Sequence, residues 1–473
     1  MSFPDAVFAA LRTDPSKIAV EHGQRAVTKT ELLNLTSRIA AGMRAAGVKR
    51  GSGVAMTTEV TPEALAAYLA AWALGARVVG VRPGFSAKQL DHILGDGLDL
   101  IVTDAKLPAL ADTEDEPLIL TSRPDQVARL VYTSGSTGLP KACAQTYQAL
   151  ADHYTWNPDT WDAPTAAMAA ACDRFLLFGS LASAVVQDFL ALCLLHGGTA
   201  VIPTRLKFPD VLAEEQISFS IMNVPRLYAM LDSLRDNPLD LSSLRGMLVA
   251  GSPLAPHRLQ EAMERIGPVI YHQYGQSETG GLTITTPAEI AAGRLDTVGK
   301  PHQRAEIEVR DGEIWARTPW MMRDYWENPS ETQEVVVDGW IRTRDLGELR
   351  DGYLHLTGRA RDVVIVNGYP VYAGPIERVL AGHADVDQAY VVGPEEVLHA
   401  FVIPMPGREP SRAELSTLVR DELGPDSVPA TITFIDSVPV APSGKPDKAA
   451  LLRRDRSGPA PQLVTGSQHS LDT

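Results

Sequence analysis

The sequence predicts an α/β protein of two domains: a large N-terminal domain of mixed and parallel sheets flanked by helices, and a small C-terminal α/β domain. The chain has 473 residues, which is too long for one compact core. Short strand-like apolar runs alternate with helical segments, as in βαβ units. A second, shorter alternation begins at residue 362 and is long enough for an independent unit.

The first helix is expected over residues 28–47, because Thr28 and Glu31 form a capping-box pattern and Gly47 is a typical stop. Short β-branched or apolar runs then predict strands at 53–56, 77–81 and 100–103. Helical spacing predicts helices at 62–75 and 91–94.

The middle of the chain is expected to be irregular over residues 149–164 and to form a helix and then a strand over 175–202. Further helices are expected at 210–215, 225–234 and 256–266, with a strand and a turn at 248–252. Residues 297–357 are predicted to be rich in strands, because three Asp-Gly pairs, at 311–312, 338–339 and 351–352, are hairpin signals.

The small domain is expected to contain strands at 363–366, 388–392, 400–403 and 431–434, and helices at 375–382 and 412–423. The chain from Arg453 is rich in Arg, Ser, Gly and Pro, so residues 457–473 are expected to be a disordered tail. These patterns divide the chain into residues 1–359, 360–456 and 457–473.

Composition excludes several classes of protein. The formal net charge of −15 argues against nucleic-acid or anionic-membrane partners, which normally need a basic footprint. The N-terminus lacks the pattern of a signal peptide, and the longest apolar stretch, residues 175–195, is interrupted by Gln187 and Asp188. We therefore expect a cytoplasmic protein with no membrane partner, whose thiols (Cys143, Cys172 and Cys193) are buried and reduced.

A loop rich in hydroxyls and glycine follows the apolar strand that ends at Tyr132. It contains Thr133, Ser134, Gly135, Ser136, Thr137 and Gly138, and Lys141 lies just beyond it. Backbone and hydroxyl donors of this kind suit a polyphosphate, whose oxygens only accept hydrogen bonds. A plain surface turn is about equally compatible with the loop alone, and its glycine spacing fits neither a Walker A loop nor a dinucleotide fingerprint.

Residues 132–141 resemble the phosphate loop of the adenylate-forming superfamily, which comprises acyl- and aryl-CoA synthetases, peptide-synthetase adenylation domains and luciferases. Further matches follow in the superfamily's order. The resemblance implies ATP and Mg²⁺ as cofactors and a mobile small domain. It places Thr133 to Gly138, Lys141 and Gly251 at the nucleotide.

Residues 271–280 resemble the superfamily's Tyr-Gly-x-Thr/Ser-Glu motif. The resemblance places Tyr274 and Gly275 at the adenine, Ser277 at the α-phosphate and Glu278 on the metal. Taken alone, the stretch is slightly more typical of a polar loop with a solvated Glu. It is not a serine hydrolase elbow, because Thr279 replaces the second glycine of that motif.

Three later matches complete the set. By resemblance, Asp345 binds the ribose and Arg359 binds the ribose or phosphates, although an isolated pair of this kind is usually a surface ion pair. Arg361 corresponds to the hinge, and Gly368 leaves room for a pantetheine arm. Lys445 is the implied catalytic lysine of adenylate formation, stabilising negative charge on the acid and the α-phosphate.

The resemblance also implies an acid-binding pocket with small or apolar walls, formed by Ala182, Ala184, Leu248, Ala250, Gln273, Gly281 and Leu282. Amino-acid-activating relatives carry an aspartate near residues 182–184, and this chain has only small neutral residues there. The two glycines at 280–281 suggest a deep pocket. Ala142 and Tyr147 depart from the pattern of many relatives, so this segment does not indicate a subfamily. Histidines 196, 272, 302 and 355 fit no metal spacing.

These features together predict ATP-dependent activation of an acyl or aryl carboxylic acid, but not of an α-amino acid, to an acyl-adenylate, followed by transfer to the thiol of CoA. The alternative acceptor is the phosphopantetheine of an acyl carrier protein. A non-catalytic nucleotide-binding protein on the same fold and a luciferase-like oxidase are the other classes considered. The retained Glu278, Asp345 and Lys445 speak against the non-catalytic class.

Overall fold

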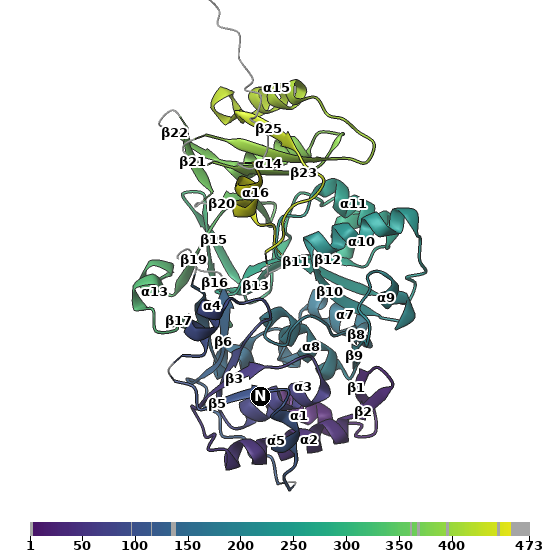
Figure 1. The fold of residues 1–473 in the computed structure, drawn as a ribbon, viewed down its shortest axis with the longest axis vertical. Coiled ribbons are helices and arrows are strands. Elements are labelled where there is room, and N and C mark those ends of the chain that lie inside the picture. Colours follow the sequence, from purple (N-terminus) through teal and green to yellow (C-terminus); the bar gives the residue numbers. More distant parts are fainter. Residues whose placement is uncertain are drawn as a thin grey trace, which may run out of the picture.

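A computed structural model describes residues 3–95, 97–114, 116–133, 139–359, 362–366, 369–393, 397–441 and 445–455. Figure 1 shows a large lower part and a small upper part stacked along the long axis of the molecule. The predicted α/β fold is confirmed. In the described residues no strand is shared between the sheets on the two sides of residue 360, although the exact domain division stays a prediction.

Two sheets form the body of the large domain. The first has nine strands in the order β14-β13-β12-β11-β10-β8-β9-β1-β2. Its strands in chain order are β1 (Ile18–His22), β2 (Arg25–Thr28), β8 (Arg174–Leu176), β9 (Thr199–Ile202), β10 (Phe219–Asn223), β11 (Gly246–Ala250), β12 (Ile270–Gln276), β13 (Gly280–Thr285) and β14 (Lys300–Pro301). Parallel pairing runs without a break from β1 through β9, β8, β10 and β11 to β12.

The second sheet has six strands in the order β17-β7-β6-β4-β3-β5. They are β3 (Gly53–Thr57), β4 (Arg77–Gly80), β5 (Leu100–Thr103), β6 (Val127–Thr133), β7 (Lys141–Thr146) and β17 (Asp324–Tyr325). A third sheet of five strands carries the three hairpins: β15 (Glu306–Arg310), β16 (Glu313–Arg317), β18 (Val336–Val337), β19 (Trp340–Arg350) and β20 (Tyr353–Arg359).

Helices connect and cover these sheets. In chain order they are α1 (Asp5–Arg12), α2 (Lys29–Ala45), α3 (Pro62–Ala73), α4 (Ala87–Ile93), α5 (Leu107–Ala111), α6 (Tyr147–Asp152), α7 (Ala163–Ala171), α8 (Ala184–His196), α9 (Asp210–Glu214), α10 (Val224–Asp236), α11 (Pro256–Arg265), α12 (Pro287–Ala291) and α13 (Pro329–Val335). The largest hydrophobic cluster takes side chains from α2, α3 and α8, so these helices hold the body together.

The small domain contains β21 (Val363–Val366), β22 (Tyr369–Tyr372), α14 (Ala373–Ala381), β23 (Val386–Val392), β24 (His399–Pro404), α15 (Arg412–Leu423), β25 (Thr431–Phe434) and α16 (Lys448–Asp455). Helices α14 and α15 pack their apolar residues with the β23-β24-β25 sheet in a separate cluster. The predicted tail, residues 457–473, lies outside the described residues.

The capping box and the Asp-Gly turns predicted from the sequence are present in the structure. The Thr28–Glu31 capping box is present, and each side chain accepts from the other residue's backbone N–H. All three Asp-Gly pairs form two-residue turns in which both residues have positive φ, between 51° and 80°. This left-handed geometry matches the twist of the flanking strands, so the predicted hairpins are confirmed.

Two stretches differ from expectation. Residues 149–164 are not irregular throughout, because α6 runs to Asp152 and α7 begins at Ala163, where Asp162 accepts a hydrogen bond from the Thr165 amide at 2.9 Å. The stretch from residue 175 begins with the three-residue strand β8 rather than with a helix. An alanine-rich helix and a strand this short give little periodicity, so pattern alone missed both.

The apolar stretch of residues 175–195 lies in the core, as predicted, but only its second half is helical, since α8 begins at Ala184. Asp188, in the middle of α8, is 2.9 Å from the Arg129 guanidinium, and both side chains are buried. The pair removes the cost of an isolated charge in the core. No helix among the described residues is both long and apolar enough to cross a bilayer.

Candidate nucleotide and acid site

The candidate site begins where β12 leaves the first sheet. Parallel strand β11 ends at Ala250, which pairs with Gln273, and β12 continues beyond this pair to Gln276. Beyond Gln276 the chain turns back into β13, and Ser277 and Glu278 occupy the two central positions of this turn. The Thr279 hydroxyl and backbone close the turn onto Gln276. Polar side chains are thus presented at the carboxyl ends of parallel strands, where α/β sheets usually bind ligands.

Asp345 is the centre of the first polar cluster. Its carboxylate is 5% exposed and accepts hydrogen bonds from the Tyr274 hydroxyl at 2.9 Å and the Gln276 amide at 2.6 Å. Its other oxygen lies 2.8 Å from Nε of Arg359. Asp345 on β19 and Arg359 on β20 are directly paired in the antiparallel ladder. The sheet therefore fixes a carboxylate and a guanidinium next to the β12 turn.

The backbone next to Asp345 is unusual. Arg344 has φ of 58°, in the left-handed region that residues with a Cβ rarely adopt. Its guanidinium is held by two carboxylates of α13, Glu331 at 3.1 Å and Glu334 at 3.0 Å. Left-handed non-glycine residues cluster at functional sites. Here the conformation aims the neighbouring Asp345 inwards while Arg344 faces the acidic helix.

Glu278 is the centre of a second cluster. One carboxylate oxygen accepts the Tyr325 hydroxyl at 2.7 Å. Tyr325 lies on β17, which pairs with β7 opposite Cys143, two residues from Lys141. The Lys141 ammonium is 5.7 Å from the centre of the Tyr325 ring and 2.7 Å from Glu331. The end of the phosphate-loop segment and the β12 turn are therefore joined through one tyrosine.

The electrostatics of both clusters follow from burial. Burial raises the pKa of Tyr274 well above its usual value, and the adjacent Asp345 raises it further. Burial also raises the pKa of Tyr325, with Glu278 as the next cause. The hydrogen bond from Lys141 lowers the pKa of Glu331. Both tyrosines therefore stay protonated donors and Glu331 stays ionised at neutral pH.

Among the residues that the structure describes, no group of three or more His, Cys, Asp or Glu side chains could hold a metal ion. Histidines 272, 302 and 355 are buried and His196 is exposed. Mg²⁺ in nucleotide enzymes is typically held by one or two carboxylates together with phosphate oxygens. The single carboxylate of Glu278 beside the phosphate-loop segment fits that donor set.

The predicted acid-pocket residues do not all lie together. Ala250, Gln273 and Gly281 are neighbours on β11, β12 and β13, and Ala182 packs against Gly80 of β4. Ala184 begins α8. Leu248 and Leu282 are at most 1% exposed, in two different hydrophobic clusters.

The space above Gly281 is filled by protein. A Cβ at this position would lie 1.9 Å from Nε2 of Gln273 and 2.6 Å from the Tyr154 hydroxyl, which are hydrogen-bonded to each other at 2.6 Å. Gly275 is equally constrained, since its Cβ would lie 2.2 Å from the Gly280 carbonyl. A Cβ at Gly280 would lie 2.5 Å from Cδ1 of Trp320. The two glycines at 280–281 therefore allow close packing here, whereas the sequence suggested a deep pocket.

Gly281→Ala is expected to lower the free energy of unfolding by ~1–3 kcal/mol, because the new methyl group overlaps the Gln273 amide. The double variant Gln273→Ala/Gly281→Ala should recover part of the loss, since the overlapping atoms are gone. Urea unfolding of the wild type, both single variants and the double variant measures the coupling. Additive losses would contradict the proposed contact.

Lys445 lies in a narrow hairpin before α16. Its carbonyl accepts the Ala441 amide at 2.8 Å, and Val440 bridges Pro446. The Lys445 side chain is exposed. The segment leading into this hairpin extends downwards from the small domain towards the large one (Figure 1).

Lys448 has a different environment, 2.7 Å from Glu377 and 3.4 Å from Asp362 within the small domain. Burial lowers the pKa of Lys448, but these two carboxylates outweigh it and raise the pKa overall. Lys448 is thus paired within the small domain, whereas the Lys445 side chain is exposed.

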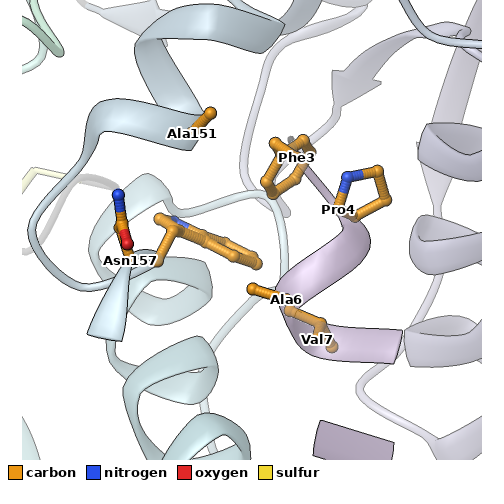
Figure 2. Close-up of a pocket in the computed structure, with 7 residues that line it drawn as sticks. Phe3, Pro4, Ala6, Val7, Ala151 and Asn157 are labelled. Atoms are coloured by element: carbon orange, nitrogen blue, oxygen red, sulfur yellow. The ribbon is translucent and has the colours of Figure 1, made fainter. Parts of the chain in front are cut away.

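The small cavities of the described residues lie elsewhere. One of about 10 Å³ opens between the start of α1 and the segment after α6, lined by Phe3, Pro4, Ala6, Val7, Ala151, Trp156 and Asn157 (Figure 2). A second of about 20 Å³ lies among α1, α3 and α8. Each holds about one water molecule at most, so neither is a binding site.

Several predicted site residues lie outside the described residues: Ser134, Gly135, Ser136, Thr137, Gly138, Arg361 and Gly368. Thr133 ends β6, and Gly251 follows β11 with φ of 100°. Tyr325, Glu331 and Gln276 were not predicted as site residues. Only the three-dimensional pairing of β17 with β7 shows the role of Tyr325, because no local motif surrounds it.

The fold and these clusters define an adenylate-forming enzyme. The AMP-binding enzyme family model matches residues 7–326, and that of its C-terminal domain matches residues 375–445. Since the first match covers more than half of the chain, this protein belongs to the AMP-binding enzyme family of the adenylate-forming superfamily. The predicted superfamily is confirmed.

Named relatives match over nearly the whole chain. Feruloyl-CoA synthase of Amycolatopsis sp is 31% identical, covering 94% of this chain and 97% of the relative. The fatty acid–[acyl-carrier-protein] ligase ScoC of Streptomyces coeruleorubidus is 30% identical, covering 93% of both. The o-succinylbenzoate CoA synthetase of Bacillus subtilis, solved with its acyl-adenylate intermediate, has a TM-score of 0.80 and 25% identity, covering 95% of this chain and 98% of that one.

Proposed function

We propose that this protein joins an acyl or aryl carboxylic acid to AMP at the expense of ATP, releases pyrophosphate, and then transfers the acyl group to the thiol of CoA. The observation that carries the proposal is that the end of β12 and the turn after it contact both polar clusters. Tyr274 and Gln276 donate hydrogen bonds to Asp345, and Glu278 accepts one from Tyr325. One short segment therefore connects a ribose-type carboxylate to the phosphate-loop segment.

In the first step a carboxylate oxygen of the acid attacks the α-phosphorus, and the bond to the pyrophosphate oxygen breaks. Asp345 is suited to accept hydrogen bonds from ribose hydroxyls, with Arg359 beside it. Lys141 and the hydroxyls of the phosphate loop would bind the polyphosphate, whose oxygens accept hydrogen bonds. Glu278 would hold Mg²⁺, which neutralises phosphate charge when it is bound. Lys445 supplies positive charge where the two anions meet.

In the second step the sulfur of the thiol attacks the acyl carbon. The bond to the AMP phosphate oxygen breaks, AMP leaves, and the thiol proton passes to solvent. We propose that the small domain turns about the segment containing Arg361, which withdraws the Lys445 hairpin and leaves room for a pantetheine arm beside Gly368. Separating the two steps replaces hydroxide, a poor leaving group, by AMP.

The proposed acid class excludes α-amino acids. An ammonium group needs an ionised partner in the pocket, and the candidate segment at residues 182–184 has only small neutral side chains. The nearest acid in sequence, Asp188, is held by Arg129 and by the Trp156 indole at 2.8 Å, with both partners buried. Its charge is therefore already compensated.

Exchange of labelled pyrophosphate into ATP is expected only when a suitable aryl or fatty acid is present, and not with α-amino acids. A panel of aryl, fatty and amino acids tests this by the rate of label incorporation. The folded state of the protein is checked by its cooperative thermal transition. Folded protein that is inactive with every acid would contradict the proposed reaction.

The acceptor is tested separately with the best acid from the panel. Thioester formation with CoA supports the proposed acceptor. Thioester formation only with phosphopantetheinylated carrier protein would identify the alternative. Both arms use the same adenylate, so the choice of acceptor is independent of the first step.

A further inference from the structure

An ion pair at the contact between the two domains is not part of the chemistry described above. Arg258 on α11 is 1% exposed, although it is a long charged side chain. Its guanidinium makes a two-pronged contact with Asp387 on β23 of the small domain, with N–O distances of 2.6 and 2.7 Å. Asp387 is 5% exposed. Fork-to-carboxylate contacts of this kind are geometrically specific.

The large domain is left with an excess of positive charge at this contact. Among the described residues of the large domain, three arginines, Arg235, Arg258 and Arg265, pair with two carboxylates, Asp232 and Glu261, at distances between 2.7 and 3.1 Å. Asp387 brings the missing negative charge from the other domain.

Neighbouring groups keep the Asp387 carboxylate ionised. Burial alone would raise the pKa of Asp387, but hydrogen bonds from His257 and Arg258 outweigh it and lower the pKa. The Gln388 amide adds a contact at 3.1 Å, and Arg258 also lies 4.9 Å above the Tyr228 ring. The carboxylate is therefore ionised and fixed at neutral pH.

The pair is far along the chain from the segment that joins the domains. Contacts close to that segment, such as those of Arg378 with the carbonyls of Leu356 and Thr357 on β20, join residues only 22 and 21 positions apart. Arg258 and Asp387 are separated by 129 residues. They meet only when the small domain rests on α11.

We propose that the Arg258–Asp387 pair is a releasable catch that holds the small domain in the orientation seen here. Its role in turnover rests on the proposed two-step reaction. When a buried ion pair forms, much of the attraction between the charges is offset by their loss of hydration. Separation into water restores that hydration. The catch therefore specifies one docked orientation, while the docked and undocked orientations differ little in free energy. This property suits a small domain that must change orientation in each turnover.

Asp387→Asn tests the catch, and Asp385→Asn is the matched control. Both substitutions remove one negative charge from the small domain, but Asp385 is paired at 3.6 Å with Arg408 of the same domain. Arg258 keeps Asp232 and Glu261 as partners in the Asp387 variant. Arg258→Lys is the second variant, since it retains the charge and loses the fork.

The first readout is the distribution of distances between labels on Glu264→Cys in the large domain and Glu422→Cys in the small one, both at exposed positions. The three native cysteines are buried and leave the introduced pair as the labelling sites. Asp387→Asn and Arg258→Lys are expected to broaden or shift the distribution relative to wild type and Asp385→Asn. A distribution unchanged in both variants would overturn the proposal, whatever reaction the protein catalyses.

The second readout compares the half-reactions. Asp387→Asn is expected to change the ratio of the pyrophosphate-exchange rate to the thioester-forming rate by roughly tenfold, because the two steps need different orientations. The Asp385→Asn ratio should match wild type. Equal slowing of both steps would indicate a merely structural role and overturn the catch. Absence of both activities in wild type would instead contradict the proposed function, while the distance measurement still decides on the catch.

Discussion

Lys445→Ala is expected to slow acyl-adenylate formation by ~10²–10³-fold while leaving ATP binding and the fold intact. The side chain is exposed next to the bridge between Val440 and Pro446, so its removal costs little packing. Its proposed task is to place positive charge between two anions in the transition state, and a neutral methyl group cannot do so. Pyrophosphate exchange measures the rate, and nucleotide titration measures binding.

The control for Lys445→Ala is Lys88→Ala, which removes another exposed lysine, on α4. The control should exchange pyrophosphate at the wild-type rate. Thioester formation from chemically prepared acyl-adenylate separates the two half-reactions, and Lys445→Ala should support it at a near-normal rate. An exchange rate for Lys445→Ala within a few-fold of wild type would rule out the assigned role.

Asp345→Ala is expected to weaken ATP binding by about 30-fold, equivalent to ~2 kcal/mol. Two effects combine. The ribose would lose an ionised acceptor, and Tyr274, Gln276 and Arg359 would lose the carboxylate that now orients all three. Because this carboxylate is buried, the variant should also unfold at a lower temperature. Nucleotide titration and thermal unfolding measure the two effects separately.

Two substitutions on β19 act as controls. Asp345→Asn keeps the shape and removes the charge, so it should fall between wild type and alanine in ATP affinity. Glu348→Gln changes an exposed carboxylate three residues further along β19 and should change neither property. If Asp345→Ala bound ATP as tightly as Glu348→Gln does, the ribose role would be wrong.

Much of the fold could be predicted because its signals are local. Strand β5 and helix α15 begin and end at the expected residues, and the Asp-Gly turns form as expected. Strand β8 and helix α7 were missed because three residues and a run of alanines carry almost no periodicity. These two elements depend on the surrounding sheet and core rather than on their own pattern.

Residues of the candidate site could be predicted only where they belong to a sequence motif. Glu278 and Asp345 could be selected from their motifs, and the structure surrounds both with hydrogen bonds. Tyr325, which joins Glu278 to the β7 segment, has no motif and depends on the pairing of β17 with β7. The Arg258–Asp387 pair joins side chains 129 residues apart, and no sequence spacing could indicate it.

The position of Cys143 has a consequence for the acceptor. This thiol lies on β7 opposite Tyr325, close to the place proposed for a reactive mixed anhydride. It is fully buried, and burial together with Glu278 raises its pKa well above the usual value. Cys172 and Cys193 are also buried. The protein thus offers no nucleophilic sulfur of its own, which protects it from self-acylation and reserves the activated acyl group for an incoming thiol.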